Sequence, residues 1–243
     1  MIRGFYPMNT VKTKGLILKS ASYGEGAKML TVLSGEYGKI SVAAKGAVSA
    51  RRGAAALGNF CYSEFILNKH SEIYSLSDVS PIESFFGLSK SLDYMQCSAD
   101  MMRFADYVSH ENASAAEVLR LSLNCLYAMA FLLRRHTDVF TVYLLRMMCE
   151  LGFNPELHSC CACGGESGLT AFSAEYGGIM CAECAENVVG TVRISPSAHS
   201  LMQYICGCPQ KQIFKFSADE KTVLEALNIV KLFISEHLNY RFD

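Results

Sequence analysis

The chain has 243 residues, 51% of them hydrophobic, so it can bury a sizeable core, and a largely disordered protein is excluded. Its longest apolar stretch, residues 121–133, contains Ser122 and Asn124 and is too short to cross a bilayer, so we expect no transmembrane segment. The net charge of −1 hides an asymmetry: residues 1–60 carry nine basic and two acidic side chains, while the remainder carries −8. This cationic first part favours a polyanionic partner, with a merely solvated basic surface as the alternative.

The first seven residues lack the basic and then apolar layout of a signal peptide. We expect residues 1–7 to be a tag or an upstream start, because a more regular pattern begins at Met8. Free cysteines in apolar segments are typical of a reducing compartment. The expected location is therefore the cytoplasm.

Five short segments of the first eighty residues have the composition of β-strands and are separated by glycine-containing turns. They are residues 15–20, 28–33, 39–44, 60–67 and 73–76. Five short strands predict a small closed barrel of the oligonucleotide-binding (OB) type, with an SH3-like barrel as the alternative. We assign residues 1–80 to this nucleic-acid-binding barrel.

Basic side chains of this first part are predicted to contact phosphate groups, and Tyr23, in a turn, is predicted to stack on a base. The basic residues are Lys12, Lys14, Lys19, Lys28, Lys39, Lys45, Arg51 and Arg52. The last two belong to a segment of small residues, 45–54, that we expect to form a surface loop between the third and fourth strands. Packing within the barrel is the alternative role for Tyr23.

From residue 81 onward, the apolar residues recur with the period of helices. Four helix starts are predicted, at Ser114-x-x-Glu117, Asp138, Ser195-Pro196 and Ser217-x-x-Glu220. The predicted fold class is α+β. It has an N-terminal five-stranded OB-type barrel packed on a C-terminal helical bundle, residues 81–243, into which a four-cysteine zinc knuckle, residues 158–186, is inserted.

Two Cys-x-x-Cys pairs, Cys160 with Cys163 and Cys181 with Cys184, are separated by seventeen residues. This spacing is typical of a four-thiolate zinc site, and it predicts one Zn²⁺ per chain. Four thiolates leave no coordination position for water or substrate, so the metal is expected to be structural. Cys161 or His158 in place of Cys160 remains an open alternative, as does a redox or disulfide pair.

No sequence motif for catalysis is visible. The chain has no phosphate-binding G-x-x-x-x-G-K-[ST] loop, no Gly-x-Ser-x-Gly nucleophile elbow and no deaminase signature, and its six histidines are dispersed. Cys206-Gly-Cys208 has the form of a reactive dithiol but has no basic neighbour close in sequence. The sequence therefore predicts a protein that is not an enzyme.

The order of these parts resembles the RecO family of bacterial DNA repair and recombination mediators over nearly the whole chain. The resembling segments are residues 18–25, 30–39, 44–47 and 151–157, and Gly177-Gly178 before the second cysteine pair. The resemblance implies an OB barrel, a helical domain and, in the zinc-bearing members, a four-cysteine knuckle. Lys45 matches the family's basic position, and Arg51 and Arg52 fall where the family carries further basic residues, but residues 47–50 are less basic than the family pattern.

The resemblance also implies a function. RecO-like proteins bind single- and double-stranded DNA, anneal complementary strands, and act with RecR to help RecA displace the single-stranded-DNA-binding protein. The family's docking groove for the acidic tail of that protein lies in the helical part, where no motif of this chain marks it. A zinc-ribbon adaptor that binds a protein partner without touching DNA, and a thiol or metal enzyme, are the alternatives.

Overall fold

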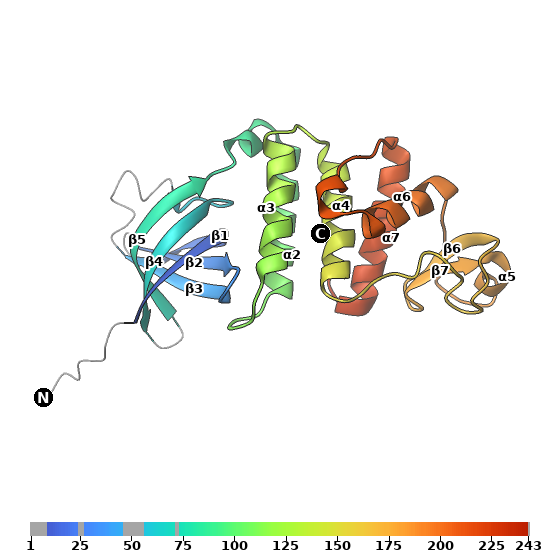
Figure 1. Ribbon diagram of the computed structural model, residues 1–243, viewed down its shortest axis with the longest axis horizontal. Coiled ribbons are helices and arrows are strands. Elements are labelled where there is room, and N and C mark those ends of the chain that lie inside the picture. The colour runs from blue at the N-terminus through green and yellow to red at the C-terminus, as the bar shows by residue number, and fades with distance from the viewer. Residues whose placement is uncertain (1–8, 24–26, 46–55, 71–72, 243) are drawn as a thin grey trace, which may run out of the picture. The chain divides into compact units, whose positions relative to one another are not determined.

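The computed structural model describes residues 9–23, 27–45, 56–70 and 73–242 (Figure 1). The chain forms two compact units, Met1–Leu132 and Leu133–Asp243, which are described separately. None of the helices in the described ranges is both long enough and apolar enough to span a membrane.

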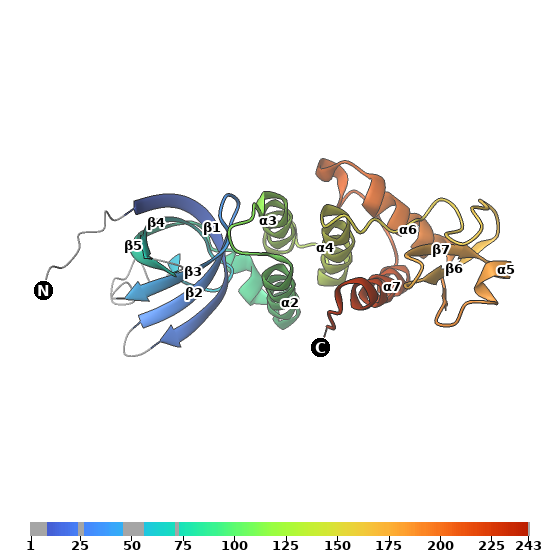
Figure 2. The same ribbon diagram turned by 90° about the horizontal axis from the view of Figure 1, so that it is seen from below.

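A closed five-stranded barrel forms the first part of the first unit (Figures 1 and 2). Its strands are β1 (Asn9–Tyr23), β2 (Ala27–Ser34), β3 (Gly38–Lys45), β4 (Tyr62–His70) and β5 (Ile73–Glu83). They close in the order β1-β2-β3-β5-β4, with β3 and β5 parallel and every other neighbouring pair antiparallel. This architecture confirms the predicted OB-type barrel and replaces the SH3-like alternative.

Alternation along the strands explains the barrel core. Leu30 and Val32 of β2, and Phe65 and Leu67 of β4, are fully buried and belong to one apolar cluster inside the barrel. Because successive residues of a strand point to opposite faces, the residues between them face outward. Burial of one such side chain stabilises the fold by about 1.5–3 kcal/mol.

The last barrel strand is longer than the sequence suggests. Strand β5 continues to Glu83 and includes Pro81, where helix was expected to begin. The pairing of β5 with β4 shifts register between Pro81 and Glu83. Proline has no N–H to donate to a regular ladder, but at such an irregularity it interrupts no regular pairing.

A 3₁₀ helix, η1 (Phe86–Lys90), and two helices, α2 (Leu92–Val108) and α3 (Ala116–Ala130), complete the first unit. Both helices contact β1, and they contact each other. The predicted division between residues 80 and 81 remains a prediction. Helices α2 and α3 belong to the same compact unit as the barrel. The sequence did not predict α2 as a separate helix.

The predicted capping box at the start of α3 is wrong. The helix begins after Ala115, whose side chain cannot cap, and the Ser114 hydroxyl donates instead to the Gly35 carbonyl oxygen at 3.2 Å. The Ala115 N–H donates to the same oxygen at 3.1 Å. Ser114 therefore fixes the turn between β2 and β3 rather than the helix.

The second unit combines three packed helices with a small three-stranded sheet (Figure 1). Its elements are α4 (His136–Glu150), β6 (Leu169–Ser173), β7 (Gly178–Cys181), α5 (Ala182–Ala185), β8 (Val192–Arg193), α6 (Pro196–Gly207), η2 (Gln210–Gln212) and α7 (Glu220–Leu238). The strand order is β7-β6-β8, and both pairs are antiparallel. Helices α4, α6 and α7 contact one another in pairs.

The helix starts of this unit agree with the sequence in part. Ser195 caps α6 as predicted, since its hydroxyl accepts from the Ala198 N–H at 3.2 Å. Helix α7 is capped by Asp219 and not by Ser217. Asp138 lies inside α4, where its carboxylate accepts from the Arg135 guanidinium at 2.8 Å and 3.1 Å, so it is not a cap.

Candidate metal centre and nucleic-acid interface

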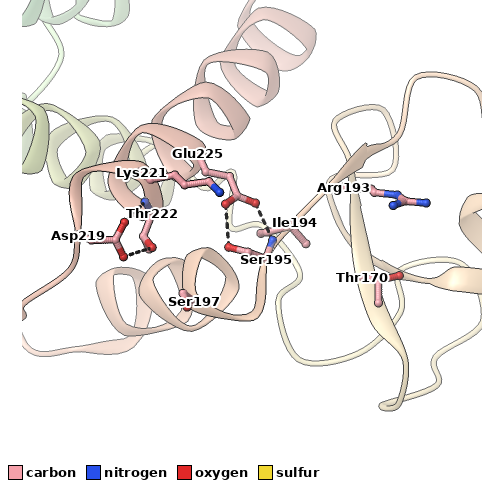
Figure 3. Close-up of a pocket in the computed structure, with 9 residues that line it drawn as sticks. All are labelled: Thr170, Arg193, Ile194, Ser195, Ser197, Asp219, Lys221, Thr222 and Glu225. Carbon is pink, nitrogen blue, oxygen red and sulfur yellow. Dashed lines mark hydrogen bonds between the residues drawn. The ribbon is translucent and has the colours of Figure 1, made fainter.

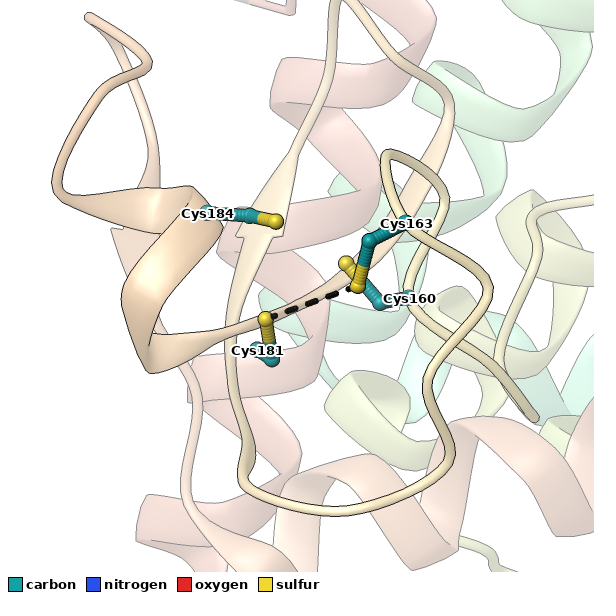
Figure 4. Close-up of side chains that lie close together, drawn as sticks. All are labelled: Cys160, Cys163, Cys181 and Cys184. Atoms are coloured by element: carbon teal, nitrogen blue, oxygen red, sulfur yellow. Dashed lines mark hydrogen bonds between the residues drawn. The ribbon is translucent and has the colours of Figure 1, made fainter.

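The four cysteines of the two predicted pairs meet in the second unit (Figure 4). Their sulfur atoms all lie within 4.8 Å of one another, and the Cys163 and Cys181 sulfurs are 3.9 Å apart. Cys160 and Cys163 come from the loop after α4, Cys181 ends β7 and Cys184 lies in α5. The side chains point inward from two opposite turns, as the ligands of a single ion would.

Backbone hydrogen bonds shape the first turn around the site. The Cys160 N–H donates to the Gly165 carbonyl at 2.8 Å, and the Gly164 N–H donates to the Cys160 carbonyl at 2.8 Å. Gly164 has φ +75°, a conformation that glycine adopts without the steric cost of a side chain. These backbone hydrogen bonds help to fix the shape of the turn.

The structure separates Cys160 from the two alternative ligands. Cys160 is buried and belongs to the cluster, whereas neither Cys161 nor His158 belongs to any metal-ligand group found among the described residues. The Cys161 N–H donates to the Ile179 carbonyl on β7 at 2.9 Å, which holds the two turns together.

The thiols of the cluster differ in acidity. Burial acts to raise the pKa of the Cys160 thiol. Backbone N–H groups of Cys181, Cys163 and Ala162 hydrogen-bond to its sulfur, and the net result is a pKa lowered to about 6. Hydrogen bonds with the Cys181 and Cys163 thiols raise the pKa of Cys184 to about 12. A metal ion that bound this set would displace the remaining protons, so its affinity would rise with pH.

The predicted DNA-contacting lysines on β1 lie at two positions. Lys12 and Lys14 line a hollow of about 390 Å³ on the face that β1 shares with β4. The Lys12 ammonium lies 2.9 Å from a carboxylate oxygen of Glu64, so part of its charge is already neutralised. Lys19 is exposed farther along β1, opposite Thr31 of β2.

Lys39 has a structural partner. Its ammonium lies 3.1 Å from an Asp106 carboxylate oxygen and donates to the Asp106 backbone carbonyl at 2.7 Å. The Lys39 N–H also donates to the His110 carbonyl at 3.1 Å. These contacts join β3 to α2 and its C-terminal end, so the side chain is not open to a phosphate group without losing them.

Lys28 and Lys45 lie together at the end of the β2–β3 hairpin remote from its turn. Lys28 pairs with Ala44, and Lys45 pairs with Ala27. Neither these two lysines nor Lys19 takes part in any ion pair found in the described part of the chain. Arg51 and Arg52, and the side chain of Tyr23, lie outside the described residues. The described lysines therefore occupy separate parts of the barrel and do not form one cluster.

Two family models together match nearly the whole chain. The model described as Recombination protein O N terminal matches residues 8–85, and the one described as Recombination protein O C terminal matches residues 90–242. The chain belongs to the RecO family.

Curated RecO proteins are similar to this chain over most of its length. "DNA repair protein RecO" of Acetivibrio thermocellus is 31% identical over 241 residues, covering 97% of this chain and 94% of the relative. The proteins of the same name from Caldicellulosiruptor saccharolyticus and Alkaliphilus metalliredigens are 35% identical over 188 residues and 27% identical over 232 residues. The first covers 74% of both chains and the second covers 94% of both.

The RecO C-terminal region of this chain also contains a polar hollow of about 810 Å³ that the sequence did not predict (Figure 3). Its lining combines two basic side chains, Arg193 and Lys221, with two acidic ones, Asp219 and Glu225. The Glu225 carboxylate accepts from the Ser195 N–H at 2.6 Å and from the Ser195 hydroxyl at 2.7 Å. The lining charges are mixed, and the Glu225 carboxylate already accepts two hydrogen bonds from Ser195, so the hollow favours neither an anion nor a cation.

Proposed function

We propose that this RecO-family chain is a DNA repair and recombination mediator that binds and anneals single-stranded DNA through its barrel. Membership of the family and a closed OB barrel that carries exposed lysines support the proposal. In its cellular role the chain acts with RecR, in the cytoplasm and on the nucleoid, and helps load RecA onto DNA covered by the single-stranded-DNA-binding protein.

The phosphate contacts are assigned first to lysines that take part in no ion pair among the residues that the structure describes. Lys19, Lys28 and Lys45, together with Arg51 and Arg52, neutralise phosphate charge and release counterions, which gives binding that depends little on sequence. Tyr23 stacks on a base. Annealing follows because neutralised strands repel each other less and expose their bases for pairing, and it needs no bond-making step in the protein.

The four-cysteine cluster is proposed to hold one Zn²⁺ with a structural role. Thiolates are ligands that zinc prefers, and a set of four leaves no open position for catalysis. Cys160, Cys163, Cys181 and Cys184 would supply the ligands, and the ion would hold the two turns of the small sheet together. In this proposal the chain performs no enzymatic reaction.

Two measurements on the full chain test the function. Binding of a fluorescent single-stranded oligonucleotide is measured across a series of salt concentrations, and annealing of complementary strands is measured without ATP. We expect binding that weakens steeply with salt and annealing well above the spontaneous rate. Binding without annealing would reject the mediator activity, and no binding at low salt would favour the protein-interaction adaptor instead.

A further inference from the structure

A corner of the second unit, where the end of α6 meets α4, brings a guanidinium next to the segment Cys206-Gly-Cys208. Arg146 of α4 donates to the backbone carbonyls of Cys206 at 3.1 Å and Cys208 at 3.2 Å. A third bond reaches the Ile205 carbonyl at 3.3 Å. The basic neighbour that the Cys206-Gly-Cys208 sequence lacks is therefore supplied by a residue sixty positions earlier in the chain.

A third cysteine joins this corner. Cys149 follows Arg146 by three residues on α4, so both side chains lie on the same side of the helix. The Cys149 and Cys206 thiols lie close enough for each to shift the pKa of the other. Both cysteines are only partly buried, which leaves them accessible to a small reagent.

The polar groups at this corner favour a negative charge. None of the salt bridges found among the described residues involves Arg146. Two buried donor atoms, Arg146 Nε and Gln210 Nε2, have no hydrogen-bond acceptor in the described part of the chain. Arg146 is a half-buried cation with one unused donor, so an anion beside it would be stabilised, and the Cys149 and Cys206 thiols are ionisable groups close to it.

The two thiols have different acidities, as the members of a reactive dithiol do. The hydrogen bond from Cys206 and the charge of Arg146 lower the pKa of Cys149, although burial and Glu150 act in the opposite direction. The same hydrogen bond, together with burial, raises the pKa of Cys206 well above that of an ordinary thiol. Cys149 is thus the better nucleophile and Cys206 the proton donor to it.

We propose that Cys149 and Cys206 form a reversible dithiol–disulfide pair that exchanges with a small disulfide such as oxidised glutathione. The Cys149 thiolate attacks one sulfur of the small disulfide, forms a mixed disulfide and releases the other half as a thiolate. Cys206 then loses its proton and attacks the Cys149 sulfur, which releases the second half as a thiol. Two protein thiols are oxidised, and one small disulfide is reduced to two thiols.

A Cys149–Cys206 disulfide would also affect the candidate metal centre. The chain between Cys149 and Cys206 contains all four cysteines of the cluster. A Cys149–Cys206 disulfide would close this segment into a loop and tie α4 to the end of α6. The second unit would then keep these helices together when the metal is lost, because the cross-link restricts the unfolded chain.

Mass spectrometry of the full, metal-loaded chain tests the pair. The protein is treated with oxidised glutathione, alkylated, and digested after arginine, lysine and glutamate. Cleavage after Arg146 and Glu150 places Cys149 in the peptide 147–150, apart from the four cysteines of the cluster. Because Cys206 and Cys208 remain in one peptide, the experiment is repeated with Cys208→Ser. We expect the cross-linked peptide in the wild type and in Cys208→Ser, and its loss in Cys149→Ser and Cys206→Ser.

A matched internal control is present in the first unit. Cys97 of α2 and Cys125 of α3 are also neighbouring thiols, but both are buried, and burial raises the pKa of Cys125 well above its ordinary value. We expect Cys97 and Cys125 to remain reduced while the Cys149–Cys206 bond forms and the metal stays bound. The proposal is overturned if the bond requires Cys208, if Cys149 stays free or retains glutathione, or if the metal cysteines oxidise first.

Discussion

The ammonium of Lys39 lies 3.1 Å from a carboxylate oxygen of Asp106 and 2.7 Å from the carbonyl oxygen of the same residue. One side chain of β3 thus contacts both the side chain and the backbone of α2. The Lys39 side chain is 27% exposed and that of Asp106 is 40% exposed, so solvent screens the ion pair in part. The contact joins the barrel to the helices of the same unit.

Replacement of Lys39 by methionine is expected to reduce the stability of the first unit. The change removes a partly screened ion pair and a charge-assisted hydrogen bond, which together contribute about 1–2 kcal/mol. Urea unfolding followed by tyrosine fluorescence measures the change. The matched variant is Lys19→Met, whose side chain is exposed on β1 and takes part in no ion pair found in the described residues, and we expect a change within about 0.5 kcal/mol. Equal losses in both variants would contradict the structural role of Lys39.

Gly38, at the start of β3, is a second point where the barrel meets the helices. Its φ is +67°, and an added Cβ would overlap the carbonyl oxygens of Ala113 and His110. Gly38→Ala is therefore expected to cost about 2–4 kcal/mol, from backbone strain and from the overlap. Gly152 has φ +88° and no atom within 4 Å of an added Cβ, so Gly152→Ala carries the strain alone, about 1 kcal/mol. A smaller loss for Gly38→Ala than for Gly152→Ala would be the contrary result.

The sequence predicted the parts of this protein whose pattern is local. Apolar and polar residues alternate within each strand, and the two members of each cysteine pair lie within a single turn. Both patterns are local, so the barrel and the four-cysteine cluster could be predicted. Some of its errors concern polar side chains whose partners are distant in sequence. Ser114 has the spacing of a helix cap, but its hydroxyl donates to Gly35, 79 residues away. Arg146 likewise reaches Cys206 only through the packing of α4 on α6.

Removal of three barrel lysines is expected to change the salt dependence of DNA binding. Each phosphate contact on a single strand contributes about 0.7 to the slope of log affinity against log salt. The variant with Lys19, Lys28 and Lys45 replaced by alanine should therefore show a slope smaller by about 2. Fluorescence anisotropy with one oligonucleotide at several salt concentrations measures it.

A control for this variant must lose the same charge elsewhere. Lys211, Lys215 and Lys221 are exposed lysines of the second unit, so their replacement by alanine changes the net charge equally. We expect the slope of this control to stay close to that of the wild type. If both triple variants reduce the slope equally, net charge and not the barrel surface determines binding, and the assignment of phosphate contacts to the barrel is lost.

Loss of one cluster cysteine is expected to abolish stoichiometric metal binding. Cys163→Ser replaces a soft thiolate by a hydroxyl that binds Zn²⁺ poorly and leaves three ligands. Metal content by atomic emission should fall from one ion per chain to near zero, and the second unit should unfold at a lower temperature. Cys161→Ser is the matched variant, since Cys161 is adjacent to the cluster but outside it, and it should retain the metal. Metal loss in Cys161→Ser would identify the wrong cysteine as a ligand.

Asp219 gives a pH-dependent contribution to the stability of the second unit. Its carboxylate accepts from the Thr222 hydroxyl at 2.7 Å and from the Thr222 N–H at 2.9 Å, and these bonds lower the pKa of Asp219. Because the pKa is lower in the folded state, the contribution is present above the ordinary aspartate pKa of about 3.9. It is lost as the pH falls through the lowered value. Asp219→Ala should thus be less stable than the wild type at pH 7, and the difference should shrink below pH 4.

Asp219→Asn separates the hydrogen bonds from the charge. Asparagine is a good helix cap and does not titrate, so this variant should keep much of the stability at pH 7 and lose the pH dependence. The urea midpoint of each variant is compared with that of the wild type at the same pH. Protonation of the cysteine cluster then affects the variant and the wild type equally. A difference between wild type and Asp219→Ala that stays constant from pH 7 to pH 3 would mean that the ionised carboxylate does not stabilise the start of α7.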